Sequence, residues 1–193
     1  MIKSGWLPYE EWQKAQDTRI ASAALLIENS AGELLVVKAY YKTHWSLPGG
    51  MVDADETPLQ AALRETQEEV GLVVAEDEVS FFAVASRSSE KGLAHQYVFR
   101  AVLDDGRLGR IVLQQSEIDA YQFLSRDAVL ASDEGFAWSI PHWANGRPGG
   151  YVETRIVDGD DERQEAVTQF VGFGSEEKQT KEEYGNISYQ STR

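Results

Sequence analysis

The chain has 193 residues, of which 42% are hydrophobic and 26% are charged, a balance typical of one globular domain with or without appendages. It contains no cysteine, which excludes disulfides, zinc–thiolate sites and a cysteine nucleophile. The formal net charge of −14 argues against broad binding of nucleic acid or anionic membrane, which requires a cationic surface. A small phosphate-bearing substrate is compatible with this charge if a divalent cation reverses the field at one site.

The first residues carry no long apolar run, and no later stretch approaches the roughly 20 apolar residues of a membrane-spanning helix. We therefore expect a cytoplasmic protein that has neither a signal peptide nor a membrane anchor.

The N-terminal part of the chain predicts a short helix followed by a hairpin. Residues 8–16 favour the helix, and residues 20–28 and 34–40 are apolar, β-leaning runs. Between these two runs, Asn29-Ser30-Ala31-Gly32 is a turn signal, which predicts the hairpin. Residues 51–52 are expected to extend a further short strand.

The strongest helical signal covers residues 57–70. Thr57 suits the N-cap, Pro58 suits the first helical position, and Gly71 is a natural C-terminal stop. Apolar residues at i, i+3, i+4 and i+7 spacing predict one buried stripe, made up of Leu59, Ala62, Leu63, Thr66 and Val70.

Further strands are predicted at residues 79–86, 95–103 and 118–124, with a tight turn at residues 104–106 and a short helix at residues 125–131. Strands mixed with helices indicate an α/β layered domain.

Composition divides the chain into three parts. We predict a helical extension over residues 1–17, the α/β domain over residues 18–157 and an acidic tail over residues 158–193. Acidic and polar residues dominate the last part, which we interpret as flexible or docked on a partner.

The helix at residues 57–70 has a second, acidic face. At about 100° per residue, Glu65, Glu68 and Glu69 fall within roughly one quadrant. Such a face is often only solvated, but it can also supply the oxygen ligands that Mg²⁺ requires. Gly49 and Gly50 precede the helix, and without side chains their backbone carbonyls could approach the same ion.

Arg64 stands beside this cluster and could pair with Glu56, fixing the preceding loop against the helix. The alternative is a surface ion pair that contributes little. In order, the chain reads Gly50, five residues, Glu56, seven residues, and then Arg64-Glu65-Thr66-Gln67-Glu68-Glu69-Val70-Gly71-Leu72.

This spacing resembles the signature of the Nudix hydrolases, in which a glycine, a glutamate and the run R-E-U-x-E-E-x-G-U follow one another at these intervals, with U usually aliphatic. Thr66 is the one departure, and its β-branched side chain can still pack inward. The resemblance implies an α/β/α sandwich with a mixed β-sheet, against which the helix of the box is packed.

The resemblance also implies the reaction, which is hydrolysis of a nucleoside diphosphate linked to another group by water attack on phosphorus, with Mg²⁺ or Mn²⁺. Carried onto this chain, it gives Glu65, Glu68 and Glu69 as metal ligands, one of them also a candidate base. A carbonyl of Gly49 or Gly50 completes part of the shell. We place Glu65, Glu68, Arg64 and Glu56 in the catalytic machinery.

Residues outside the box supply the remaining candidates. Glu117 could be an extra acidic ligand or base, because some relatives bring one from a loop, or it could be a solvent-facing residue. Lys42 and His44 directly precede the Gly-Gly segment and could hold substrate phosphates, as could Lys38 and Arg87. For each of these four the alternative is an ordinary surface charge.

The substrate class follows by elimination. ADP-ribose-cleaving members tend to carry a proline soon after the box and diadenosine-polyphosphate cleavers a tyrosine, whereas here the next proline is Pro141 and the first tyrosine is Tyr97. A nucleoside triphosphate or another small nucleotide derivative remains. The alternative function is a non-catalytic nucleotide-sensing or scaffold domain, against which the intact box argues, and a further hypothesis is a homodimer in which the tail crosses to the partner.

Overall fold

The computed structural model describes residues 8–14, 18–90, 92–158, 162–172 and 187–190. The strands in these ranges are β1 (Ile20–Glu28), β2 (Leu34–Ala39), β3 (Gly49–Met51), β4 (Ser80–Ser89), β5 (Gly92–Val102), β6 (Ile118–Leu124), β7 (Gly150–Asp158), β8 (Glu162–Gly172) and β9 (Ile187–Gln190). The helices are α1 (Tyr9–Lys14), α2 (Pro58–Val70), the 3-10 turn Glu76–Glu78, α3 (Asp105–Leu108), α4 (Arg126–Ala131) and α5 (Ser139–Ala144). None of the described helices combines the length and the apolar character needed to cross a bilayer.

The described strands form one mixed sheet in the order β6-β2-β1-β5-β4-β7-β8-β9, with β3 paired to β1 outside this path. The pairs β1–β5 and β4–β7 are parallel, and the other pairs are antiparallel. On its other edge β1 changes partner along its length: Ser22 to Ala24 pair with β3, whereas Glu28 pairs with β2. This divergence places the Gly-Gly segment beside the start of β1.

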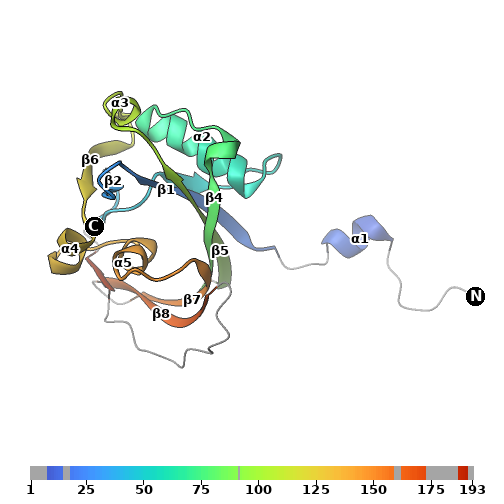
Figure 1. Cartoon of the computed structure of the whole chain (residues 1–193). Coiled ribbons are helices and arrows are strands. Elements are labelled where there is room, and N and C mark those ends of the chain that lie inside the picture. The colour runs from blue at the N-terminus through green and yellow to red at the C-terminus, as the bar shows by residue number, and fades with distance from the viewer. Residues whose placement is uncertain (1–7, 15–17, 91, 159–161, 173–186, 191–193) are drawn as a thin grey trace, which may run out of the picture.

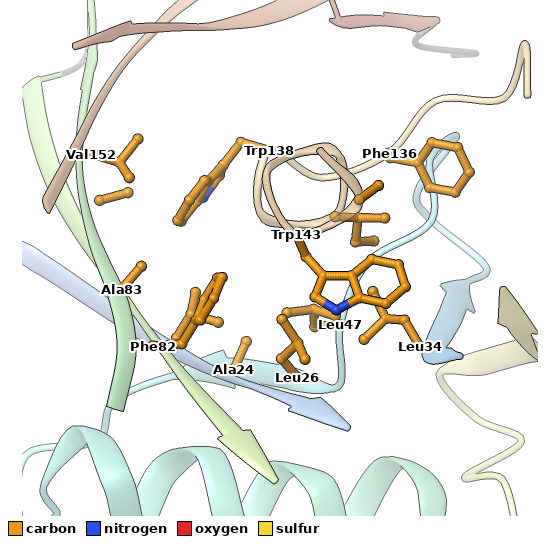
Figure 2. Close-up of a cluster of buried hydrophobic side chains, with 14 of the residues drawn as sticks. Ala24, Leu26, Leu34, Leu47, Phe82, Ala83, Phe136, Trp138, Trp143 and Val152 are labelled. Carbon is orange, nitrogen blue, oxygen red and sulfur yellow. The ribbon is translucent and has the colours of Figure 1, made fainter. Parts of the chain in front are cut away.

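Helices cover both faces of the sheet, which confirms the predicted α/β/α sandwich with a mixed β-sheet (Figure 1). On one face, α2 packs over the apolar side chains Leu25, Ile27 and Val37. On the other face, α5 contributes Trp143 to a second cluster, which also contains Trp138 just before the helix. Figure 2 shows these two indoles packed over the sheet side chains Leu26, Phe82, Ala83 and Val152.

The predicted limits of the box helix are confirmed. The Thr57 hydroxyl accepts the N–H of Gln60 at 3.2 Å, and the Gln60 side chain accepts the N–H of Thr57 at 2.9 Å, which forms a capping box. Gly71 adopts the left-handed conformation (φ 71°) that ends the helix.

The buried side of α2 is wider than the predicted stripe. Ala61 and Glu69 are buried, whereas Leu59 and Leu63 are only half-buried. Besides the sheet, α2 contacts a second segment: the N–H of Val112 donates to Val70 O, and the N–H of Gln114 donates to Glu69 O. The Glu69 side chain itself is bonded to β3, since its carboxylate accepts the N–H of Gly49, and it is not on a solvated face.

The structure contradicts one element of the prediction for residues 104–106, where we expected only a tight turn. Asp104 accepts the N–H of Arg107 with its side chain and so caps the short helix α3. The helix α5 and the strand β7 were not predicted.

The interpretation of everything after residue 158 as a tail is wrong for residues 162–172. These residues form β8, which pairs with β7 from Gly150 to Asp158. Val167 and Glu165 are buried in this strand, and Glu165 is paired with Arg87. The prediction was wrong because composition alone does not distinguish a buried, paired glutamate from a solvated one.

Glu28 at the end of β1 is also buried, at 3% exposure. Its carboxylate accepts hydrogen bonds from Trp143 Nε1 at 3.0 Å and from Arg100 Nε. Arg126 lies 3.8 Å from the same carboxylate and stacks on the Trp143 ring. This network joins β1, β5, α4 and α5 through side chains that are distant in sequence.

Candidate active site

The two glycines of β3 allow the strand to lie against α2 and β1. A methyl group at Gly50 would overlap the carboxylate of Glu65, and one at Gly49 would overlap the backbone of Ala23 and Ala24. The missing side chains therefore let the Glu65 carboxylate sit directly on the backbone of β3.

Arg64 organises the acidic groups around it. Its Nε and Nη2 atoms donate to the two carboxylate oxygens of Glu56 at 3.1 and 2.8 Å. Its Nη1 atom donates to Glu65 at 2.9 Å and to Glu68 at 3.0 Å. The predicted Arg64–Glu56 pair is thus present and bidentate, and hydrogen bonds from Arg64 and from the N–H of Asp53 lower the pKa of Glu56 to about 2.

Glu69 occupies a different environment from the other carboxylates of the box. It is 2% exposed, and its Oε2 accepts the N–H of Gly49 at 2.9 Å. Burial raises its pKa to about 7, although the bond from Gly49 and the charge of Lys42 oppose this shift. Burial also raises the pKa of Glu65.

A cleft of about 530 Å³ opens beside β3. Three carboxylates line it: Glu65 and Glu68 from α2, and Glu117 from the residue before β6. Glu117 is half-buried and accepts the hydroxyl of Tyr41 at 2.9 Å, a bond that together with burial raises the pKa of Tyr41. The structure thus brings Glu117 to the same cleft as the box, although 48 residues separate it from Glu69 in the sequence.

Of the four predicted phosphate-binding residues, Lys42 and Arg87 line the cleft. Lys42 is largely buried, which lowers its pKa, and the carboxylates of Glu69 and Glu117 oppose that effect. Among the described residues that line the cleft, Lys38 and His44 are absent.

Lys38 and His44 have other surroundings. Lys38 Nζ donates to the carbonyl of Thr43 at 2.5 Å and lies 5.6 Å from the Trp45 ring centroid. Burial, with the charges of Lys42 and Lys38, lowers the pKa of His44 to about 4, so this imidazole is neutral at pH 7. A neutral imidazole cannot provide the positive charge that a phosphate-binding histidine would supply.

Sequence reasoning missed Gln96 and Ser139, which line the cleft from β5 and the start of α5. Gln96 Oε1 accepts the indole N–H of Trp138 at 2.6 Å, which orients its amide. Gln96 could have been found only from its register: it faces Ser22 of β1, and both residues line the cleft.

The oxygen ligands needed for a divalent cation are present, but the described carboxylates do not yet converge. No group of three Asp, Glu or His side chains in the described ranges is arranged to hold one ion. Glu65 and Glu68 both accept hydrogen bonds from Arg64 Nη1. Carboxylate oxygens are ligands that Mg²⁺ prefers, so the donor set of Glu65, Glu68 and Glu117 in the cleft fits such a cation.

Three features together are typical of a Nudix-type domain: the Gly-Gly segment of β3, the capped acidic helix α2, and the arginine that is paired with a glutamate of the preceding loop. A family model described as the NUDIX domain matches residues 17–154, so this chain belongs to the NUDIX domain family.

Relatives agree with this assignment. A MutT-like protein of Streptomyces ambofaciens is 37% identical over 108 residues, which cover 56% of this chain and 65% of that protein. An RNA pyrophosphohydrolase of Alkalilimnicola ehrlichii is 36% identical over 58 residues, which cover 30% of this chain and 32% of that protein. The matched segments thus span about a third to two thirds of these relatives.

Among solved structures, the MutT NUDIX hydrolase from Burkholderia pseudomallei has the same fold. It superposes with a TM-score of 0.56 at 18% identity, over 67% of this chain and 98% of that one.

Proposed function

We propose that this chain is a pyrophosphohydrolase that uses Mg²⁺, or Mn²⁺ in its place, to cleave the diphosphate linkage of a nucleoside triphosphate or a small nucleoside diphosphate derivative. One observation carries the proposal: Glu65, Glu68 and Glu117 line the same cleft as the cations Lys42 and Arg87. Carboxylates suit a metal, and the two cations suit the phosphates that the metal would share.

Glu65, Glu68 and Glu117 are the residues that would hold the metal, with a carbonyl of Gly49 or Gly50 beside them. A bound cation supplies charge neutralisation at the phosphates and a lower pKa for water. Glu69 was predicted as a metal ligand, but its buried Oε2 accepts the N–H of Gly49. We therefore propose that Glu69 supports the backbone beside the metal and does not bind the metal itself.

The side chains of the chain itself divide the remaining tasks. Glu65 and Glu68 are the carboxylates of the box that line the cleft, so each is a candidate to accept the proton of the attacking water. Arg64 donates two hydrogen bonds to Glu56 and so holds the preceding loop against α2. Lys42 and Arg87 would orient the anionic substrate.

The test is phosphate and pyrophosphate release from nucleoside triphosphates, sugar nucleotides, dinucleotides and a 5′-triphosphorylated RNA, each with Mg²⁺ and with Mn²⁺. The RNA is included because one relative is an RNA pyrophosphohydrolase. The net charge of −14 predicts that this chain binds the RNA poorly, so the RNA tests that prediction. The Glu68→Gln variant should lose at least about 100-fold in kcat, since it removes a ligand. The exposed Glu76→Gln is the matched control, and equal rates for the two variants would contradict the assignment.

A non-catalytic nucleotide-sensing domain is a second candidate, and the hydrogen bonds of Glu65 and Glu68 to Arg64 are the observation that favours it. It predicts that nucleotides raise the melting temperature while none is cleaved with either metal. The cytoplasmic location and the homodimer stay predictions from the sequence.

A further inference from the structure

Arg87 enters the cleft in a fixed orientation, and a residue of β8 fixes it. Arg87 Nε and Nη2 donate to the two carboxylate oxygens of Glu165, each at 2.7 Å. This fork-to-fork geometry sets the plane of the guanidinium as well as its position. The arginine side chain is 25% exposed, whereas that of the glutamate is 3% exposed.

Glu165 is itself held from the strand between them. Arg87 of β4 is paired in register with Thr154 of β7, and the Thr154 hydroxyl donates to Glu165 Oε1 at 2.7 Å. The arginine thus reaches across β7 to a carboxylate on β8. Both oxygens of this buried carboxylate accept hydrogen bonds, so its desolvation is compensated.

Stability alone is a poor explanation for this arrangement. Desolvating two charges costs free energy, and an apolar pair of similar volume often stabilises a fold as well or better. An arginine that must present donors to a ligand has no such substitute. The partly exposed side of the pair is the arginine, and it faces the cleft.

The position of Glu165 in the chain also points to a role particular to this protein. The family match ends at residue 154, within β7, and β8 begins at Glu162. The hairpin β7–β8 therefore adds a buried carboxylate from outside the matched region to a cleft built mostly within it.

We propose that Glu165 is a positioning residue for substrate binding: it holds Arg87 so that the guanidinium donates to an acceptor oxygen of the nucleotide. The inference rests on the proposed function, since that function supplies the nucleotide. Arg87 and Lys42 line the same cleft as the carboxylates Glu65, Glu68 and Glu117. The acceptor is either a phosphate oxygen or an oxygen of the nucleoside.

The experiment compares Glu165→Gln, Arg87→Gln and the double variant, with GTP, ATP and inorganic tripolyphosphate as Mg²⁺ complexes. For Glu165→Gln we expect KM to rise about tenfold or more while kcat changes less than about threefold. The double variant should have the KM of Arg87→Gln alone, because a positioning residue has no effect once its arginine is gone. Glu153→Gln on the opposite face of β7 is the matched control.

The KM values distinguish the two possible acceptors of the Arg87 hydrogen bond. An equal rise in KM with tripolyphosphate assigns the acceptor to a phosphate, and a rise with nucleotides alone assigns it to the nucleoside. An unchanged KM with a lower melting temperature, or effects that multiply in the double variant, would overturn the inference.

Two further measurements cover the cases in which Glu165→Gln does not fold or wild type has no activity. If Glu165→Gln fails to fold, the double variant, which leaves no unpaired charge, provides the comparison with wild type: a wild-type KM would overturn the inference. If wild type cleaves nothing, the proposed function fails instead, and the nucleotide-induced shift of the melting temperature tests Glu165 without turnover: a full shift in the variant would refute it.

Discussion

Replacing Glu69 by glutamine tests the environment of the buried carboxyl group under α2. The glutamine keeps an oxygen that accepts the N–H of Gly49, and it has no charge to bury. Burial raises the pKa of Glu69 from 4.5 to about 7. The folded protein therefore retains this proton up to about pH 7, whereas the unfolded chain releases it near pH 4.5, so wild type loses stability as the pH rises through this window.

The magnitude follows from the two pKa values. Each pKa unit corresponds to about 1.4 kcal/mol, so Glu69→Gln should gain about 1.4 kcal/mol over wild type at pH 5.5 and about 3 kcal/mol at pH 8. Urea unfolding in the presence of a chelator measures the free energy at both pH values, above the pI of 4.6. Any constant offset from altered packing cancels when the two pH values are compared.

A pH-independent difference in stability between the two proteins would refute this reasoning. The exposed Glu76→Gln, measured in parallel, controls for the substitution itself.

Two further predictions address the box. Gly50→Ala should lower kcat/KM about tenfold or more with little change in melting temperature, because the new methyl group displaces the Glu65 carboxylate; a Mg²⁺ titration of activity measures it, and wild-type activity would contradict the contact. Glu56→Gln should lower the melting temperature at pH 7. The pKa of Glu56 is lowered in the folded protein, so its ionised form stabilises the fold above pH 4.5, and this contribution is lost as the pH falls through about 2. A melting temperature at pH 7 equal to that of wild type would show that the pair with Arg64 contributes nothing to stability.

The sequence predicted the elements that local chemistry determines. Thr57, Pro58 and Gly71 set the ends of the box helix because caps and stops act within a few residues. The box spacing predicted the pair of Arg64 with Glu56, which the structure contains. These two residues are only eight positions apart.

The features that sequence reasoning missed depend on long-range packing. Glu69 followed the periodicity of a solvated face, but its carboxylate is buried and accepts the N–H of Gly49. Glu165 lay in a stretch that composition marks as a tail, and only its bonds to Arg87 and Thr154 show why it is buried. Periodicity and composition register polarity, whereas burial of a charged group depends on a partner from elsewhere in the chain.

The buried carboxylate of Glu28 limits the order in which the chain can acquire its structure during synthesis. β1 is made early, yet its terminal carboxylate is satisfied by Arg100 and Trp143, which follow 72 and 115 residues later. Until α5 exists, burying the end of β1 leaves a charged group without its full set of donors, which costs free energy. A nascent chain that stops short of Trp143 should therefore hold no stable domain, and the sheet and both helical layers should form as one cooperative unit once α5 has been made.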